Sequence, residues 1–433
     1  MSLRLQVLAL LAALVSAASC TVSSGETIAE TKPVNQDSLR HAAQVDSIMQ
    51  RLSIREKVAQ LFVIEISRFP NRATKAVQDT LVKSYGVGNL ILMKGPVRQF
   101  IDRVNELQAL ADIPLLVATD AEWGAAMRFQ EYCPYPRQAL LGRMENREDL
   151  MYEMGRNVGR ELKDLNILIN MAPVADICSN PYNKALSQRS FGGDPKLVAD
   201  YASAYMRGMQ DEGIYACGKH YPGHGDNYVD SHFALPVIRH SRAHLDTVDL
   251  FPYNKLFREG MEMVMVGHFS IPAIDPSGTP MSISKICMDS LLKGDQGFKG
   301  VIMTDAVQMK GLSNGRSAVK ANIAVYKAGA DMILMPQDVI RSIKAIADSV
   351  STGKFPVEEL DAKVRKVLDL KARAGYFDKG FNPQVTDLDR KIKEALTRDT
   401  SLIFKMEKAM EESSKPKIKA WGRDRTLLLD PKK

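Results

Sequence analysis

Eight short apolar runs of strand-forming residues alternate with longer amphipathic stretches along this chain of 433 residues. Continuous apolar strands separated by helices are typical of a parallel sheet that is buried on both faces. Eight is also the number of strands that closes a (β/α)8 barrel. The sequence therefore predicts an α/β fold, a single (β/α)8 TIM-type barrel over residues 46–378. The expected strands span residues 58–66, 87–93, 113–119, 165–174, 215–218, 263–266, 300–304 and 331–335, with helices between them, for example over 146–162, 195–212 and 317–328.

Polar side chains follow the carboxyl ends of these runs, where barrel enzymes build their active sites. A doubly wound sheet would also carry its site at strand ends, but no Gly-x-Gly-x-x-Gly motif follows a strand in this chain. The barrel is therefore the favoured architecture. The polar residues at these strand ends are Asp120, Asp176, Lys219, His220, His268 and Asp305.

The two ends of the chain differ from the barrel region. Residues 1–20 combine a basic residue, an apolar run and small residues before Cys20, as an export signal peptide does. This ending resembles a bacterial lipoprotein cleavage site, so we expect a lipid on Cys20; ordinary cleavage after Ala17 or Ala18 is the alternative. Residues 21–45 would then be a polar tether. Residues 379–433 form a lysine-rich extension, of which 391–410 can be helical, whereas a run such as residues 411–417 is expected to be a solvated linker.

Charge and signal sequence limit the partners and the compartment. The 58 basic and 51 acidic residues are spread along the chain and give a net charge of +7. Nucleic-acid-binding proteins usually concentrate their basic residues in one stripe, so no nucleic-acid partner is expected. We expect export to the bacterial periplasm or outer membrane, with membrane contact only through a lipid on Cys20.

The densest group of reactive side chains lies in residues 219–232, which leave a strand and pass through a Pro-Gly-x-Gly turn. In an extended segment, Asp230 and His232 share a face, so the carboxylate can hold one imidazole nitrogen while the other meets a substrate. Such a pair is a tunable general acid/base. The same segment could instead bind zinc through His220, His224, His232 and Asp230. Lys219 beside His220 argues against a metal.

Three further motifs offer ligand contacts. Asp305 ends an apolar run and is a candidate for chemistry at the barrel rim or for a helix N-cap. Asp120, Trp123 and Arg128 lie within nine residues and suit a polyhydroxylated ligand or a local salt bridge. Arg189 precedes an expected helix start at residues 194–195, which leaves its side chain for a ligand or for a carboxylate.

Together and in this order, these segments resemble glycoside hydrolase family 3, and within it the β-N-acetylglucosaminidase branch. The resemblance begins at residues 52–62, reaches its most specific motif at Lys-His-Tyr-Pro-Gly-His-Gly-x4-Asp-Ser-His over 219–232, and ends near residue 377. It implies a retaining exo-β-N-acetylglucosaminidase that acts through a glycosyl-enzyme intermediate, with no cofactor and no metal. The implied roles are nucleophile for Asp305, acid/base dyad for Asp230 and His232, and contacts to terminal N-acetylglucosamine for Asp120, Arg128, Arg189, Lys219, His220 and His268.

The expected partner is therefore a glycan that contains N-acetylglucosamine, with peptidoglycan fragments as a candidate source. Two positions depart from the family pattern: Trp123 stands where many relatives have Gly, and Ala306 where many have a second Asp. Two rival functions remain open. One is a metal-dependent amide or ester hydrolase on the same barrel, and the other is a sugar-binding lipoprotein without turnover.

Overall fold

The computed structural model describes residues 36–67, 74–178, 182–183, 185–225, 235–313 and 315–413. The barrel lies within a compact unit that begins at His41. Among the described residues, no helix combines the length and the apolar character needed to cross a bilayer. Cys20 lies outside the described residues, so its lipidation stays a prediction.

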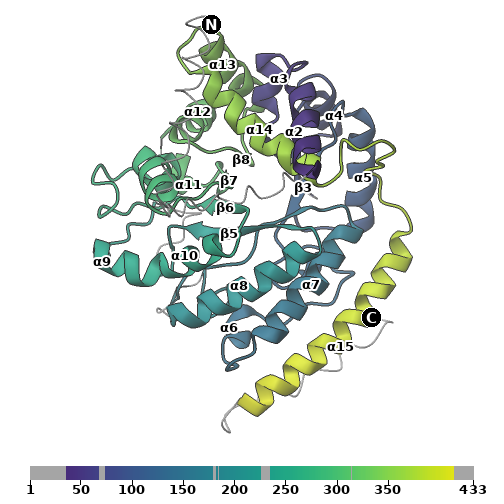
Figure 1. The fold of residues 1–433 in the computed structure, drawn as a ribbon, viewed down its shortest axis with the longest axis vertical. Coiled ribbons are helices and arrows are strands. Elements are labelled where there is room, and N and C mark those ends of the chain that lie inside the picture. Colours follow the sequence, from purple (N-terminus) through teal and green to yellow (C-terminus); the bar gives the residue numbers. More distant parts are fainter. Residues whose placement is uncertain are drawn as a thin grey trace, which may run out of the picture. The chain divides into compact units, whose positions relative to one another are not determined.

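Eight parallel strands form one sheet in the order β7-β6-β5-β4-β3-β2-β1-β8, surrounded by helices (Figure 1). The sheet closes on itself, because the amide of Thr304 donates to the carbonyl of Met332 at 3.1 Å across the seam between β7 and β8. The expected (β/α)8 barrel is thereby confirmed. The strands are β1 Phe62–Ile66, β2 Asn89–Leu92, β3 Leu116–Thr119, β4 Ile169–Asn170, β5 Tyr215–Tyr221, β6 Met263–Val266, β7 Val301–Thr304 and β8 Ile333–Leu334.

Each observed strand overlaps one of the expected apolar runs, and the first run shows how the two differ. Val58 and Ala59 belong to helix α3, Ile54–Ala59, because Ser53 and Glu56 form a capping box that starts a helix there. The strand proper begins at Phe62. Strand β5 extends past its expected end to Tyr221, and its register against β6 shifts between Gly218 and Tyr221. This irregularity re-aims the side chains at positions 219 and 220.

Helices cover the outside of the barrel, and the most extensive helix–helix contact joins α7 and α8 (Figure 1). A Cβ on Gly155 of α7 would lie 2.3 Å from the carbonyl oxygen of Tyr205 in α8, so only glycine allows this close crossing. Helix α8 starts where its sequence predicts, with Asp194 as N-cap and Pro195 in the first turn. The helices are α2 Gln36–Met49, α3 Ile54–Ala59, α4 Lys75–Lys83, α5 Val97–Leu110, η1 Ala125–Met127, α6 Gln138–Leu141, α7 Glu148–Asp164, α8 Pro195–Asp211, α9 Arg242–His244, η2 Leu245–Asp249, α10 Phe251–Arg258, η3 Met281–Ile283, η4 Ile286–Asp295, α11 Lys310–Ser313, α12 Ala318–Ala328, α13 Val339–Ser351, α14 Val357–Arg373 and α15 Leu388–Ser413.

The C-terminal extension contributes helix α15, which packs alongside α7 (Figure 1). It buries the apolar side chains of Leu402, Met406 and Ala409 and also the carboxyl of Asp399. The hydroxyl of Tyr135, in the loop after η1, donates to Asp399 Oδ1 at 2.8 Å. The helix expected over residues 391–410 is therefore present, and it is docked on the protein.

Candidate active site

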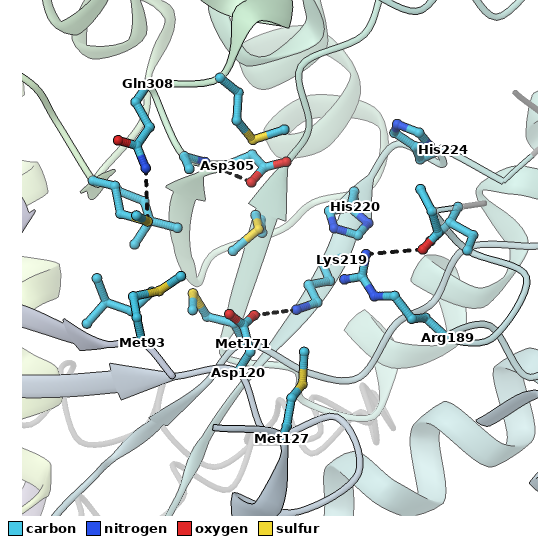
Figure 2. A pocket seen from close by; sticks show the side chains of 18 of the residues that line it. Met93, Asp120, Met127, Met171, Arg189, Lys219, His220, His224, Asp305 and Gln308 are labelled. Carbon is cyan, nitrogen blue, oxygen red and sulfur yellow. Dashed lines mark hydrogen bonds and ion pairs between the residues drawn. The ribbon is translucent and has the colours of Figure 1, made fainter. Parts of the chain in front are cut away.

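A cavity of about 700 Å³ opens at the carboxyl ends of the barrel strands (Figure 2). Its lining includes Met93 after β2, Asp120 after β3, Met171 after β4, Asp305 after β7 and Met335 after β8. Because parallel strands bring their carboxyl ends to one rim, residues far apart in the sequence meet here. The volume lies within the range of about 300–1,000 Å³ that suits one small ligand.

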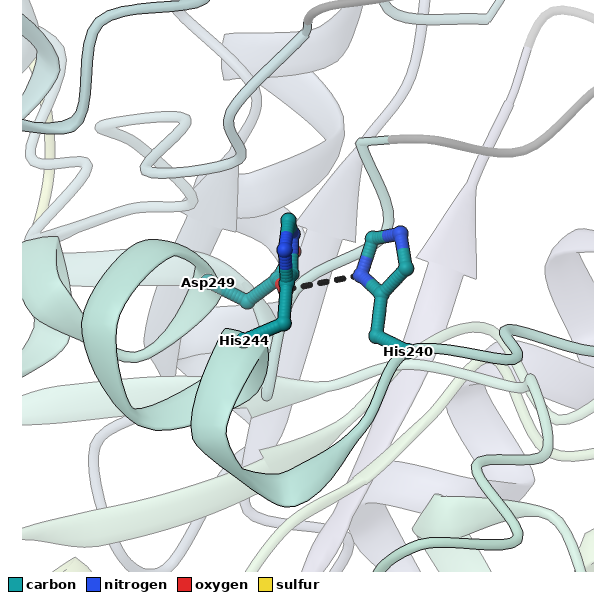
Figure 3. A group of neighbouring side chains, drawn as sticks. All are labelled: His240, His244 and Asp249. Atoms are coloured by element: carbon teal, nitrogen blue, oxygen red, sulfur yellow. Dashed lines mark hydrogen bonds and ion pairs between the residues drawn. The ribbon is translucent and has the colours of Figure 1, made fainter.

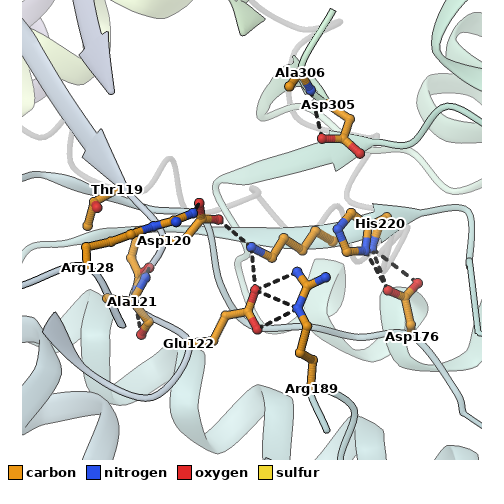
Figure 4. Close-up of polar contacts among 12 residues, drawn as sticks. Thr119, Asp120, Ala121, Glu122, Arg128, Asp176, Arg189, His220, Asp305 and Ala306 are labelled. Carbon is orange, nitrogen blue, oxygen red and sulfur yellow. Dashed lines mark hydrogen bonds and ion pairs between the residues drawn. The ribbon is translucent and has the colours of Figure 1, made fainter. Parts of the chain in front are cut away.

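One side of the cavity is an ion-pair network of two carboxylates and three cations (Figure 4). The Nζ of Lys219 lies 2.6 Å from Asp120 Oδ1 and 2.7 Å from Glu122 Oε1. Arg128 donates to the other oxygen of Asp120. Arg189 binds Glu122 through two nitrogens, with Nη2 to Oε1 at 2.6 Å and Nε to Oε2 at 2.9 Å. Every charge in this network therefore has an opposite charge at hydrogen-bond distance.

The network keeps both carboxylates ionised although they are buried. Burial raises the pKa of Glu122, but Arg189 and Lys219 outweigh it and lower that pKa to about 2. Burial likewise opposes the ionisation of Asp120, and Lys219 with Arg128 holds its pKa far below the usual range. The same two carboxylates raise the pKa of Lys219 against the effect of its burial. Asp120, Glu122 and Lys219 thus present fixed charges rather than groups that titrate near neutrality.

Asp176 binds the two histidines of residues 219–232 that the structure describes, His220 and His224. Asp176, which follows β4, is fully buried and accepts from His220 Nδ1 at 2.7 Å and from the amide of His224 at 2.8 Å. These contacts set the direction of the His220 ring, which lines the cavity (Figure 4). The ring of His224 also lines the cavity, and its Nδ1 has no hydrogen-bond partner among the described residues. Burial lowers the pKa of His224, which favours the neutral imidazole.

Asp305 lies across the cavity from the ion-pair network (Figure 2). Its amide donates to the carbonyl of Val266 in β6 at 3.0 Å, and its Oδ1 accepts from the amide of Ala306 at 2.7 Å. Helix α11 begins only at Lys310, so Asp305 is not the N-cap of that helix. Its carboxylate instead lies on hydrogen-bonded backbone directly after β7 and borders the cavity.

His268 differs from the expectation that it holds the sugar, because it is fully buried and does not belong to the cavity lining. Its Nε2 lies 3.1 Å from the carbonyl oxygen of Ala306, and its Nδ1 lies 2.6 Å from Ser282 Oγ. Nε2–H therefore donates to Ala306, and Nδ1 accepts from the serine hydroxyl. In this structure His268 positions the backbone that follows Asp305.

Trp123 also lies outside the cavity lining, although an aromatic face in this loop suits a sugar. The guanidinium of Arg137 stacks 3.4 Å from the centre of its ring. Methionines supply much of the apolar lining, and their flexible thioethers adapt to ligands of different shape. They are Met93, Met127, Met171, Met265, Met309 and Met335.

The six expected sugar-binding residues thus fall into two groups. Asp120, Arg128, Arg189, Lys219 and His220 come together at the cavity, whereas His268 lies behind it. Asp230 and His232 lie outside the described residues, so their role as acid/base dyad stays a prediction. Sequence reasoning missed Glu122 as a member of the site. Its position two residues after Asp120 was the available signal, but only burial beside two cations shows what it does.

Comparisons with known proteins agree with this architecture. The sequence pattern described as the glycosyl hydrolase family 3 N-terminal domain matches residues 53–370. β-Hexosaminidase A of Pseudoalteromonas piscicida is 30% identical over 325 residues, which are 68% of this chain and 54% of that protein. The chain therefore spans about half the length of that relative.

Two solved structures show the same fold. A glycoside hydrolase family 3 β-N-acetylglucosaminidase from Paenibacillus sp. str. FPU-7 superposes with a TM-score of 0.73 at 30% identity, over 83% of this chain and 69% of that chain. A β-glucoside phosphorylase superposes with a TM-score of 0.76 at 25% identity, over 86% of this chain and 66% of that chain. The resemblance seen in the sequence is thereby confirmed: this chain belongs to glycoside hydrolase family 3 and is related to its β-hexosaminidases.

Proposed function

We propose that the protein is a retaining exo-β-N-acetylglucosaminidase that removes terminal N-acetylglucosamine from β-glycosides. The observation that carries this proposal is that Asp305 borders the same cavity as the network of Asp120, Arg128 and Lys219. A carboxylate on one side and fixed hydrogen-bonding charges on the other suit one sugar ring held against a nucleophile. The kinship with β-hexosaminidases supports the same conclusion.

The network has the donors and acceptors that a sugar needs. A lysine ammonium carries three N–H donors. Lys219 donates to Asp120 and also forms an ion pair with Glu122, which leaves a donor for a hydroxyl in the cavity. A carboxylate offers about four acceptor positions, and Asp120 uses two of them. Both residues can therefore bind a ligand without breaking their ion pair.

In the proposed reaction, Asp305 attacks the anomeric carbon as the bond to the leaving oxygen breaks, and His232 gives its proton to that oxygen. A glycosyl ester on Asp305 results. His232, now neutral and oriented by Asp230, takes a proton from water, and the hydroxyl attacks the same carbon and frees Asp305. Two inversions at one carbon retain the anomeric configuration. A histidine has an ordinary pKa of about 6.5, so it can supply this proton without deep burial.

The proposed reaction takes place outside the cytoplasm. An export signal ending at Cys20 supports a protein anchored by lipid in the periplasm or outer membrane, where peptidoglycan fragments supply terminal N-acetylglucosamine. Labelling with a radioactive fatty acid tests the anchor. A labelled protein whose label disappears in Cys20→Ala supports it, and an unlabelled mature protein contradicts it.

A hydrolysis screen tests the activity. Aryl β-N-acetylglucosaminide is compared with aryl β-glucoside, each in buffer with and without phosphate, and Asp305→Asn is the inactive control. A site that hydrogen-bonds the acetamide should discriminate by as much as about 10⁴-fold, because the glucoside leaves its polar groups unpaired. Equal rates contradict the acetamide specificity. A sugar phosphate as product would identify a phosphorylase.

A further inference from the structure

Two histidines and an aspartate that do not line the cavity converge near the start of the helical segment 242–258 (Figure 3). His240 Nδ1 lies 2.9 Å from Asp249 Oδ2, and His244 Nε2 lies 3.6 Å from the same oxygen. The three ligand atoms all lie within 4.8 Å of one another. In the part of the chain that the structure describes, no other three His, Cys, Asp or Glu side chains converge in this way.

A π-turn in the helix makes this convergence possible. His244 ends α9, and Asp249 ends the π-helix η2 that follows it. The amide of Leu250 donates to the carbonyl of Leu245 at 2.8 Å, which is the five-residue step of a π-turn. Residues five apart therefore lie on the same side of the helix here, which places Asp249 next to His244. Such turns interrupt helices frequently at functional sites.

We propose that His240, His244 and Asp249 form a binding site for a divalent cation of the zinc class. Tetrahedral zinc with bonds of about 2.0–2.2 Å holds its ligand atoms about 3.3–3.6 Å apart. Two of the three separations, 2.9 and 3.6 Å, bracket that range, and the third is at most 4.8 Å. Binding replaces the hydrogen bond between His240 and Asp249, and the Nδ1 proton goes to solvent.

The donor set and its exposure favour zinc over the harder cations. Two imidazoles with one carboxylate suit zinc, whereas Mg²⁺ and Ca²⁺ prefer oxygen ligands throughout. The side chain of His244 is 43% exposed, so water can reach the fourth position, while that of Asp249 is only 3% exposed. A buried carboxylate of this kind is held in place before the metal arrives.

The site would join two stretches of chain that flank residues 226–234, the segment containing Asp230 and His232. Gly223 precedes that segment and packs on Asp249, since a Cβ on Gly223 would lie 2.9 Å from the Cβ of Asp249. His240 follows it, two residues after Ile238, whose amide donates to Ser270 O at 2.8 Å. We assign the cation a structural role, and it takes no part in the glycosidic reaction. The proposal is therefore independent of the proposed activity.

Calorimetric titration of the purified, chelator-treated full chain with Zn²⁺ tests the site. We expect one equivalent to bind, and the thermal midpoint to rise with Zn²⁺ concentration because the cation binds the folded state. Co²⁺ should give the strong visible absorption of four-coordinate cobalt. In His240→Ala and in His244→Ala, Kd should rise by at least about tenfold, the size of effect that even outer-shell changes at metal sites produce.

Two histidine variants serve as matched controls. His41→Ala removes a histidine in α2, and His232→Ala removes one from the segment where an active-site metal would bind. Both controls should keep the bound equivalent, and circular dichroism without metal should show that all four variants are folded. The proposal requires this pattern. Any other pattern overturns it, including a Kd that is unchanged in His244→Ala or an equivalent that is lost in His232→Ala.

Discussion

Lys219 and Glu122 form an ion pair almost without solvent contact: the Nζ and Oε1 atoms are 2.7 Å apart, and the side chains are 2% and 0% exposed. Lys219 belongs to β5, and Glu122 to the loop after β3. The pair therefore fixes the distance between strand β5 and the loop after β3, both of which reach the cavity. Ions that are paired before a ligand arrives need no reorganisation when it binds.

Lys219→Met should be strongly destabilising, because it leaves two buried carboxylates short of a cation. Removing one partner of a buried ion pair typically costs about 3–5 kcal/mol. Urea denaturation measures the loss. Lys344→Met is the matched control, since Lys344 is 73% exposed and pairs only at the surface with Asp348, an interaction worth at most about 1 kcal/mol. Equal losses in the two variants would contradict this account of the network.

Asp305→Asn and His232→Ala should separate the two catalytic roles. Asp305→Asn removes the nucleophile, so turnover should collapse for every substrate whatever its leaving group. His232→Ala should slow glycosylation of natural disaccharides by about 10²–10⁴-fold and of aryl glycosides far less, because a good leaving group needs little protonation. Rapid-quench kinetics compare these rates before the steady state.

The intermediate itself can be trapped. With an activated aryl substrate, His232→Ala should show a burst and then weak turnover, because hydrolysis of the intermediate lacks its base. A 2-acetamido-5-fluoro sugar should leave a covalent adduct on Asp305 that peptide mass spectrometry detects. An adduct on another carboxylate would reassign the nucleophile.

His268→Ala should lower kcat more than it raises KM. The variant frees the Ala306 carbonyl that His268 holds at 3.1 Å and so loosens the backbone beside Asp305, while the sugar contacts stay in place. An unpaired buried carbonyl also costs about 1–3 kcal/mol of stability. His268→Gln can donate a similar hydrogen bond and should recover part of kcat. A larger effect on KM than on kcat would instead indicate direct contact with the sugar.

Stability should fall with rising pH because of a buried carboxyl pair between α7 and α15. Burial, with the neighbouring charge of Asp399, raises the pKa of Glu161 well above 4.5. Burial also raises the pKa of Asp399. A carboxyl whose pKa is higher in the folded state stabilises the protein below its unfolded pKa, and this contribution disappears as pH rises through the folded pKa.

Glu161→Gln should therefore flatten the decline of the unfolding free energy above pH 4.5, since the amide oxygen can still accept from Ala125 N, as Oε2 does at 2.8 Å. Urea denaturation over a pH series measures the slope. Glu153→Gln is the control, because Glu153 also joins α7 to α15, through Lys405, but is 48% exposed. A slope that Glu161→Gln leaves unchanged would contradict the assignment.

The sequence alone predicted the barrel and much of the rim. Apolar runs of strand length mark β2, β3, β6 and β7, in which every residue is buried, so the local pattern carried the information. Polar residues directly after those runs had to reach one rim, because parallel strands in a closed sheet end on the same side. Asp120 and Asp305 were identifiable for that reason.

Tertiary structure decided what each of these polar groups contacts. His268 follows strand β6, and His220 lies at the end of strand β5. His268 binds Ser282 and Ala306 behind the cavity, whereas His220 lines the cavity. Glu122 became a member of the site only through burial beside Lys219, and the helix of the extension is docked through the burial of Leu402, Met406 and Asp399. Burial and charge pairing depend on neighbours that are distant in sequence, so a local pattern of residues cannot contain them.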